Sequence, residues 1–168
     1  MNICGYIPES VNEGIGLRAV IFISGCKHKC PGCHNQSSWD FDYGTEFTEE
    51  EQLRIIDEIK ENQLLDGVTI CGGDPFFSSK EVVLFLKKLK EHVPNINIWT
   101  YTGFKYEDII RLNRKDMMEL LLETDVLIDG KYIEELRDLT LAFRGSKNQK
   151  VIDVKRSLME NKIIELNV

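Results

Sequence analysis

The chain has 168 residues, of which 42% are apolar and 29% are charged, and this composition is typical of one globular domain rather than of a disordered or collagen-like chain. Acidic residues outnumber basic residues by 28 to 21, for a formal net charge of −7, which disfavours non-specific binding to nucleic acid. No apolar run approaches the ~20 residues that span a bilayer and no signal-peptide pattern opens the chain, so we predict a single cytoplasmic domain over residues 1–168 with no membrane or nucleic-acid partner.

The first half of the chain alternates strand and helix patterns. Residues 17–24 (LRAVIFIS) are rich in β-branched and aromatic side chains and predict a buried strand. Thr48 and Glu51 form a capping-box pattern that predicts the start of a helix with an apolar stripe. Residues 67–71 (GVTIC) then predict a second strand.

The second half continues this alternation. Ser78 and Glu81 form another capping-box pattern, which predicts the start of a helix that ends before Pro94. The remaining predicted elements are a strand at 96–101, helices at about 106–112 and 116–123, a strand at 125–129, and strands near Val151 and Ile163 around a short helix.

Strands that alternate with helices indicate right-handed βαβ units and a parallel sheet. A complete eight-fold barrel usually needs about 250 residues, more than this chain contains. We therefore predict the α/β fold class, with an incomplete, open (β/α) barrel built on a curved, mostly parallel sheet.

Three of the five cysteines lie within eight residues, as Cys26-x₃-Cys30-x₂-Cys33. Cytosolic thiols stay reduced, so this cluster indicates a metal or redox site rather than disulfides. Three thiolates on a tight loop can hold three irons of a [4Fe–4S] cluster and leave the fourth iron open to a small molecule. We interpret Cys4 and Cys71 as small buried hydrophobic residues.

Zinc is the alternative ligand for these thiolates. His28 or His34 would then complete a Cys₃His site, and the chain would be a non-catalytic adaptor whose cysteines only staple a loop. Structural zinc sites usually draw their ligands from two separated pairs, which this sequence lacks. Otherwise His28 and His92 are interpreted as surface residues without chemistry.

Unusual loops follow each predicted parallel strand. The cysteine cluster follows the first strand, Gly72-Gly73-Asp74-Pro75 the second, Thr102-Gly103 the third and Gly130-Lys131 the fourth. The carboxyl ends of parallel strands meet at one rim, so these loops are expected to converge on one site. Two adjacent glycines let a ligand approach the backbone closely.

These motifs resemble those of the radical S-adenosylmethionine (SAM) enzymes. The three-cysteine motif is similar to their cluster-binding signature, and Gly72-Gly73-Asp74-Pro75 to the glycine-rich motif that holds the methionine end of SAM. More narrowly, four segments resemble the activating proteins of anaerobic ribonucleoside-triphosphate reductase, and the resemblance extends from about Met1 to Asp153. They are Cys30-Pro-Gly-Cys33-His-Asn-Gln-Ser-Ser-Trp39, Trp99-Thr-Tyr-Thr-Gly103, Asp125-Val-Leu-Ile-Asp129-Gly-Lys131 and Phe143-Arg-Gly-Ser-Lys-Asn-Gln149.

The resemblance implies an activating enzyme with two cofactors, a [4Fe–4S] cluster and SAM. Cys26, Cys30 and Cys33 would ligate three irons, and the fourth would bind the amino and carboxylate groups of SAM. An external donor such as reduced flavodoxin would reduce the cluster, SAM would be cleaved to a 5′-deoxyadenosyl radical, and this radical would generate a glycyl radical on the large subunit of the reductase. The SAM-contacting residues it implies are Gly32, Cys33, His34, Gly72 and Gly73, with Asp129 and Lys131 at the same rim.

Several alternatives stay open at the level of sequence. Asp129 and Lys131 could instead be a helix cap and a solvated lysine, and Trp39 and Trp99 are expected in the core. The target could be another glycyl-radical enzyme, such as pyruvate formate-lyase, or a pterin-like small molecule. We expect Gly73→Val to weaken SAM binding and to leave the cluster in place.

Overall fold

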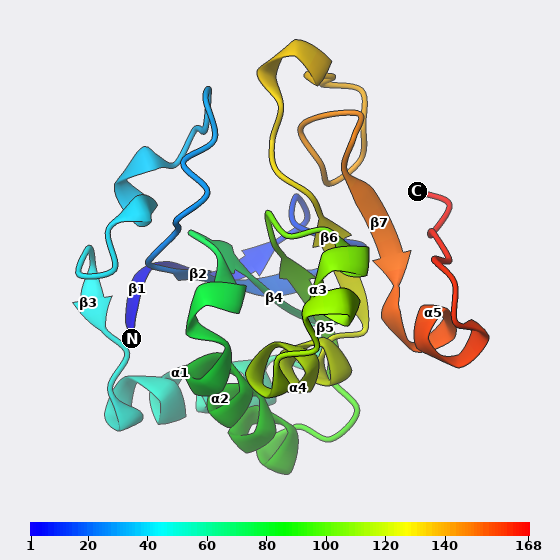
Figure 1. Ribbon diagram of the computed structural model, residues 1–168. Helices are drawn as coiled ribbons and strands as arrows, with labels where there is room; N and C mark the ends of the chain where they lie inside the picture. The colour runs from blue at the N-terminus through cyan, green and yellow to red at the C-terminus, as the bar shows by residue number, and fades with distance from the viewer.

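A seven-stranded sheet forms the centre of the computed structural model, which describes residues 1–168 (Figure 1). Its strands are β1 (Asn2–Ser10), β2 (Arg18–Ile23), β3 (Thr45–Glu46), β4 (Gly67–Gly72), β5 (Asn97–Tyr101), β6 (Val126–Asp129) and β7 (Lys150–Asp153), in the order β3-β1-β2-β4-β5-β6-β7. The central strands β2, β4, β5 and β6 are parallel, and β1, β3 and β7 are antiparallel to their neighbours. The end strands β3 and β7 do not pair with each other, so the predicted open α/β sheet is confirmed.

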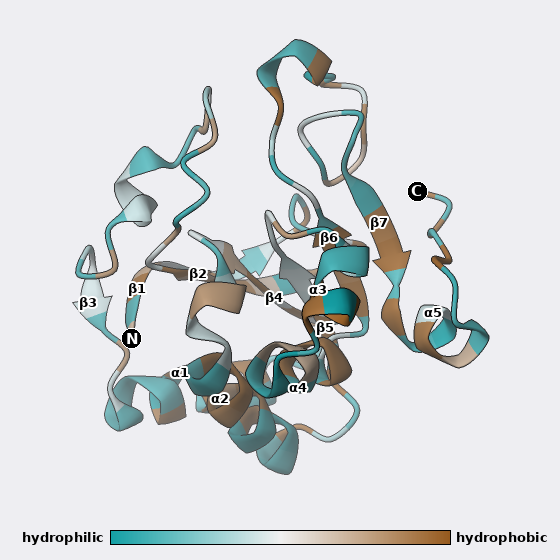
Figure 2. Ribbon diagram, in the orientation of Figure 1, coloured by the Kyte–Doolittle hydropathy of each residue, from teal (hydrophilic) through white to brown (hydrophobic).

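Helices cover one face of this sheet. They are α1 (Glu49–Glu61), α2 (Ser79–His92), α3 (Tyr106–Leu112), α4 (Lys115–Glu123) and α5 (Val154–Glu160), with 3₁₀ turns at Gln36–Trp39, Pro75–Ser78 and Glu134–Leu136. In Figure 1, α1, α2 and α4 lie together beneath the strands, and Figure 2 shows apolar residues along this layer. None of the helices combines the length and apolar character needed to cross a membrane.

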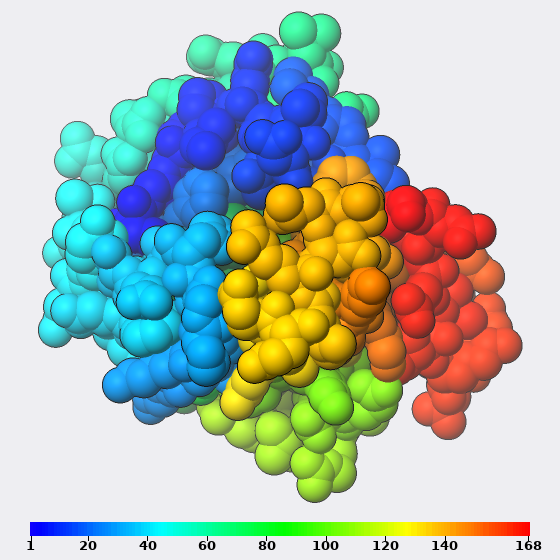
Figure 3. Space-filling model, turned by 90° about the horizontal axis from the view of Figure 1, so that it is seen from above, coloured from blue at the N-terminus to red at the C-terminus, as the bar shows by residue number.

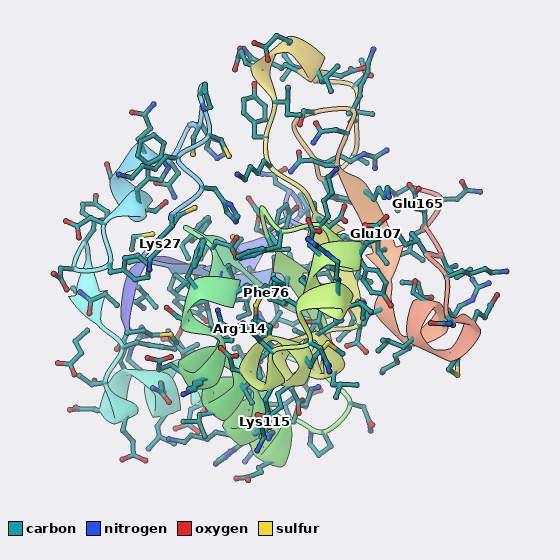
Figure 4. The ribbon with its side chains drawn as sticks, viewed as in Figure 1. Lys27, Phe76, Glu107, Arg114, Lys115 and Glu165 are labelled. Carbon is teal, nitrogen blue, oxygen red and sulfur yellow. The ribbon has the colours of Figure 1, made fainter.

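The main hydrophobic core lies between the sheet and these helices. It contains 25 buried residues, in which alternate strand residues such as Ile21 and Ile70 meet helix residues such as Ile56 and Leu86. Phe76, labelled in Figure 4, belongs to this core and is 1% exposed. Stability is therefore concentrated on the helix side, away from the loops that follow the strands.

The opposite face of the sheet carries a second, smaller layer around Arg18 and Trp99. The Arg18 guanidinium donates to Thr69 Oγ1 at 2.8 Å, and to the carbonyl oxygens of Val68 at 2.8 Å and Asn97 at 2.9 Å. It also lies over the Trp99 ring, 5.2 Å from its centroid. Burial lowers the pKa of Arg18 to about 10. This face is filled by packed side chains below the loops, and Trp99 belongs to the core as expected.

Three local predictions differ from the structure. Strand β1 was not predicted, because Gly5 and Pro8 interrupt its apolar pattern; Pro8 lies where the pairing with β2 is irregular, between Ile7 and Ser10, so its missing N–H costs no regular ladder bond. The Ser78 side chain makes no capping hydrogen bond, since Asp74 caps the preceding 3₁₀ turn by accepting from Phe76 N–H. The predicted strand near Ile163 is only a single bridge between Ile152 and Glu165.

Candidate functional site

A cavity of about 890 Å³ lies at the carboxyl ends of the parallel strands. Its walls come from the loops that follow β2, β4, β5 and β6, as the sequence predicts. Seen from above, residues near 30 and residues near 135 lie side by side over the sheet (Figure 3). Segments separated by about a hundred residues in the chain therefore form opposite walls of one cavity.

The three-cysteine motif forms one wall. Cys26 is buried, Cys30 and Cys33 are partly exposed, and all three line the cavity. Two backbone hydrogen bonds fix the base of the loop, from Gly25 N–H to Ser38 O at 2.8 Å and from Cys26 N–H to Trp39 O at 3.1 Å. Within the loop, Cys33 N–H donates to Cys30 O at 3.1 Å. The motif is thus a tight turn whose entry is anchored and whose thiols face a common space.

The glycine motif packs directly against the base of that loop. Gly73 N–H donates to Ile23 O at 2.7 Å, and Asp74 N–H donates to Gly25 O at 2.9 Å. A Cβ atom on residue 73 would lie 2.6 Å from Gly25 O, a distance that Cβ atoms essentially never show. Gly72 has φ +103°, a conformation that side chains rarely adopt. Gly72 and Gly73 therefore line the cavity and also let the cysteine loop approach.

The opposite wall begins after β6. Lys131 is exposed at the cavity, and Gly32 of the cysteine turn lies so close to the opposite wall that a Cβ atom there would collide with the Glu134 carboxylate and lie 3.2 Å from the Tyr132 ring. His34 is exposed and also lines the cavity. The predicted contacts Gly32, Cys33, His34, Gly72, Gly73 and Lys131 are therefore brought together with Cys26 and Cys30.

Asp129 is the exception among the predicted site residues. It is 2% exposed and does not line the cavity. Its carboxylate accepts from Tyr106 N–H at 2.8 Å, at the first residue of α3, and from Lys150 N–H at 3.2 Å. The expectation that Asp129 binds SAM is corrected: its oxygens are used to cap a helix and join β6 to β7, which is the alternative that the sequence left open.

His28 was wrongly interpreted as a surface residue. Only 8% of its side chain is exposed, and its Nε2 lies 2.8 Å from Asp74 Oδ2. Its ring packs against Phe77 and Phe104, with ring centroids 5.0 Å and 4.7 Å away. The flanking residues Lys27 and Lys29 hid this burial from sequence reasoning, because a histidine between two lysines has the pattern of a solvated loop.

The protonation of the thiols bears on what they can bind. Burial raises the pKa of the Cys26 thiol to about 11, and it also raises the pKa of Cys30. An unliganded Cys26 is therefore protonated near neutral pH, and a metal must displace that proton. Soft thiolates select iron–sulfur clusters, zinc or copper(I).

The arrangement of the donors bears on which metal group they can hold. Nowhere do three His, Cys, Asp or Glu side chains converge on a position for one metal ion. Tetrahedral zinc requires all four ligands about 2.0–2.3 Å from a single ion, and His28 is occupied by Asp74. Each thiolate of a [4Fe–4S] cluster binds a different iron, so a cluster does not need that convergence. The donor set of this cavity fits a cluster with three protein ligands.

Comparisons with known proteins agree with this geometry. A family model described as a 4Fe–4S single cluster domain matches residues 12–152. The anaerobic ribonucleoside-triphosphate reductase-activating protein of Haemophilus influenzae is 38% identical over 152 residues, which cover 89% of this chain and 96% of that protein. The chain belongs to this family of reductase-activating proteins.

Other members of the reductase-activating protein family show similar identity. The Escherichia coli K12 protein is 34% identical over 90% of this chain and 97% of its own length. The protein of Enterobacteria phage T4 is 36% identical over 90% of this chain and 93% of its own length. The cluster domain of this reductase-activating protein begins at Asn12 and ends in β7, and therefore includes both walls of the cavity.

Proposed function

We propose that this chain installs a glycyl radical on the large subunit of anaerobic ribonucleoside-triphosphate reductase, using a [4Fe–4S] cluster and SAM. The observation that carries the proposal is the junction of the cysteine loop with Gly72 and Gly73 on one cavity, in a chain that belongs to the reductase-activating family. The whole chain, residues 1–168, acts as one domain in this proposal.

Residue roles follow from position. Cys26, Cys30 and Cys33 hold three irons through their thiolates. The exposed backbone of Gly72 and Gly73, with Gly32, Cys33 and His34 across the cavity, holds SAM, because peptide groups without side chains can approach a ligand's amino and carboxylate groups. Lys131 supplies a cation for an anionic group of SAM, such as its carboxylate.

When bound, the cluster and SAM would supply the one-electron radical chemistry that removes a hydrogen atom from a glycine of the target. The chain supplies binding, orientation and shielding. Its cavity is at the upper end of the range of about 300–1,000 Å³ that is usual for ligand sites. In this proposal the reductase inserts its glycine segment from the open side of the cavity.

The electron donor in this proposal is reduced flavodoxin or a similar one-electron carrier, and the compartment is the cytoplasm, where thiols remain reduced. The net charge of −7 argues against a nucleic-acid partner. No membrane partner is required by any residue of the site.

Electron paramagnetic resonance under anaerobic conditions tests the proposal. The reconstituted chain is mixed with a reductant, SAM and the large reductase subunit from the same organism. We expect a stable glycyl-radical doublet that requires every component and disappears in Cys30→Ala, because a cluster with two protein ligands is not retained. Cys4→Ala is the matched control and should keep the signal, since Cys4 does not line the cavity.

The other outcomes have distinct meanings. SAM cleavage without the doublet would show that the target is a different glycyl-radical enzyme, such as pyruvate formate-lyase, or a small molecule. A colourless, zinc-containing protein without a cluster signal after reconstitution would replace the proposal with the zinc adaptor. Retained SAM cleavage in Cys30→Ala would contradict the assignment of the cysteine ligands.

A further inference from the structure

The cysteine loop is held to the loops after β4 and β5 through the His28 side chain. Among the side chains of residues 27–34, only His28 has a carboxylate partner, with its Nε2 2.8 Å from Asp74 Oδ2, while Cys30 and Gly32 meet the other wall at Tyr132 and Glu134. The bond from Cys33 N–H to Cys30 O is internal to the turn, and Lys27 and Lys29 are exposed. His28 is therefore the side chain that ties the first half of the cysteine loop to Asp74.

A fitted socket receives the His28 ring. Phe77 lies on one side, and Phe104 meets the ring edge-on at an interplanar angle of 72°. Gly103 forms part of this socket, because a Cβ atom there would collide with the imidazole. Phe77 lies in the turn after β4, and Gly103 and Phe104 lie in the loop after β5. The His28 ring therefore packs the cysteine loop against both of these segments.

The Asp74 carboxylate that meets His28 is itself immobilised. It is 1% exposed, and its Oδ1 accepts from Phe76 N–H at 2.9 Å. Its Oδ2 accepts from Gly103 N–H at 2.9 Å and from the Thr102 hydroxyl at 3.0 Å, in addition to His28. No lysine or arginine pairs with it. One buried carboxylate therefore ties together the loops after β2, β4 and β5, and it directly follows Gly73 in the chain.

We propose that His28 is a positioning residue that, through Asp74, sets the distance between the cysteine loop and the Gly72-Gly73 backbone. This inference rests on the proposed function, in which the cluster and the glycines must hold one SAM molecule between them. His28 lines the cavity, but its Nε2 is engaged by Asp74, and the proposal assigns it no bond to either cofactor. It acts by fixing the loop that bears the ligands, since misplacing a site by about 1 Å can cost a hundredfold in rate.

A pair of His28 variants separates hydrogen bonding from packing. His28→Phe keeps a ring between Phe77 and Phe104 but has no donor for Asp74. His28→Gln keeps an N–H donor at a similar reach. Thr100→Val is the matched control: it removes a buried hydrogen bond, between Thr100 and Thr124 at 2.9 Å, from the helix side of the sheet, and therefore reports general loss of stability.

The first readout uses the protein without a cluster. Alkylation of the buried Cys26 is followed at fixed pH by mass spectrometry of its peptide. We expect His28→Phe to be alkylated about tenfold faster than the wild type, which corresponds to the loss of one charge-assisted hydrogen bond. His28→Gln and Thr100→Val should remain within about threefold of the wild type, a change below 1 kcal/mol.

The second readout uses the reconstituted, reduced protein. SAM affinity is measured from the change that SAM causes in the cluster's electron paramagnetic resonance spectrum. At matched iron content, His28→Phe should bind SAM about tenfold more weakly, and His28→Gln should restore the affinity. Thr100→Val should bind SAM as the wild type does, although it unfolds at a lower denaturant concentration.

Unchanged Cys26 protection and SAM affinity in His28→Phe would overturn the proposal, as would equal losses in His28→Phe, His28→Gln and Thr100→Val. If the wild type binds no SAM, the proposed function fails, and alkylation alone decides the role of His28. Slow alkylation of Cys26 in His28→Gln together with fast alkylation in His28→Phe then supports the positioning role of His28. Equal alkylation rates in the two variants refute it.

Discussion

Asp129 combines deep burial with two backbone donors, and this makes its contribution to stability depend on pH. Burial raises the pKa of its carboxyl, outweighing the opposite effect of hydrogen bonds from the Tyr106 and Lys150 N–H groups. The folded protein therefore holds this proton more tightly than the unfolded chain does. The ionised form costs stability above the raised pKa, and this cost is absent below the unfolded value of about 3.9.

We predict that Asp129→Asn destabilises the protein by about 1–3 kcal/mol, because one amide oxygen cannot satisfy both backbone donors. Its difference from the wild type should be larger near pH 4 than near pH 7, since only the wild type loses stability as the carboxyl ionises. Urea unfolding of both proteins at the two pH values measures this. A difference that grows with pH would contradict the assigned direction of the shift.

Individual residues were predicted well where their chemistry is local and poorly where it depends on distant partners. The spacing of Cys26, Cys30 and Cys33 is visible within eight residues, and all three line the cavity. The contact between His28 and Asp74 joins residues 46 apart, so no window around His28 contains its partner. Asp129 was placed at the correct rim, but a strand of only four residues did not reveal which side its carboxylate takes.

At the scale of elements, the junction of β2 and β4 controls the site. Their parallel pairing continues to Ile23 and Gly72, and the backbones remain in contact as far as Gly25 and Asp74. The cysteine loop and the glycine motif are therefore one unit. A side chain at residue 73 would meet Gly25 O and Ser38 O, so we now expect Gly73→Val to disturb the cysteine loop as well as SAM binding.

We predict that even Gly73→Ala lowers both iron content and SAM affinity, because the new Cβ atom would lie 2.6 Å from Gly25 O and 2.8 Å from Ser38 O. Iron analysis after anaerobic reconstitution and SAM titration measure the two effects. Gly5→Ala is the matched control, since its Cβ atom would meet Phe22 at an ordinary 3.4 Å. Full iron content in Gly73→Ala would show that the loop adjusts without loss.

The strand and helix pattern of the chain was predictable because the central strands have continuous apolar runs and the helices have clear apolar stripes. β1 escaped prediction because its pairing is irregular and a third of its residues are exposed. The capping hydrogen bond predicted for Ser78 at the start of α2 is absent, because Ser78 and Asp74 are both capping residues at this point of the chain. Asp74 is the one that caps the turn, and that same carboxylate holds His28.

At the scale of the whole molecule, the core and the site occupy different sides of the sheet. The 25-residue core packs against the helices, and the cavity is built from loops. We predict that removing the cluster leaves the far-ultraviolet circular dichroism spectrum unchanged, because no residue of α1, α2 or α4 lines the cavity. Amide hydrogen exchange should accelerate in residues 24–44 and 130–149 and stay constant in α1, α2 and α4.

Hydrogen exchange of the reconstituted and cluster-free protein, compared peptide by peptide, measures this prediction. Added Zn²⁺ is the control for non-specific thiol binding. Faster exchange throughout the helices would show that the fold depends on the cluster, as small metal-dependent domains do.

The two walls of the cavity are far apart in the chain, and this has a consequence for the protein during its synthesis. Cys26–Cys33 are translated about 100 residues before the wall from Lys131 to Gln149. At about 5–20 residues per second, on the order of 10 seconds separate the two. For that interval the nascent chain displays all three thiols with no opposite wall, so the iron ligands are complete well before the chamber that shields them.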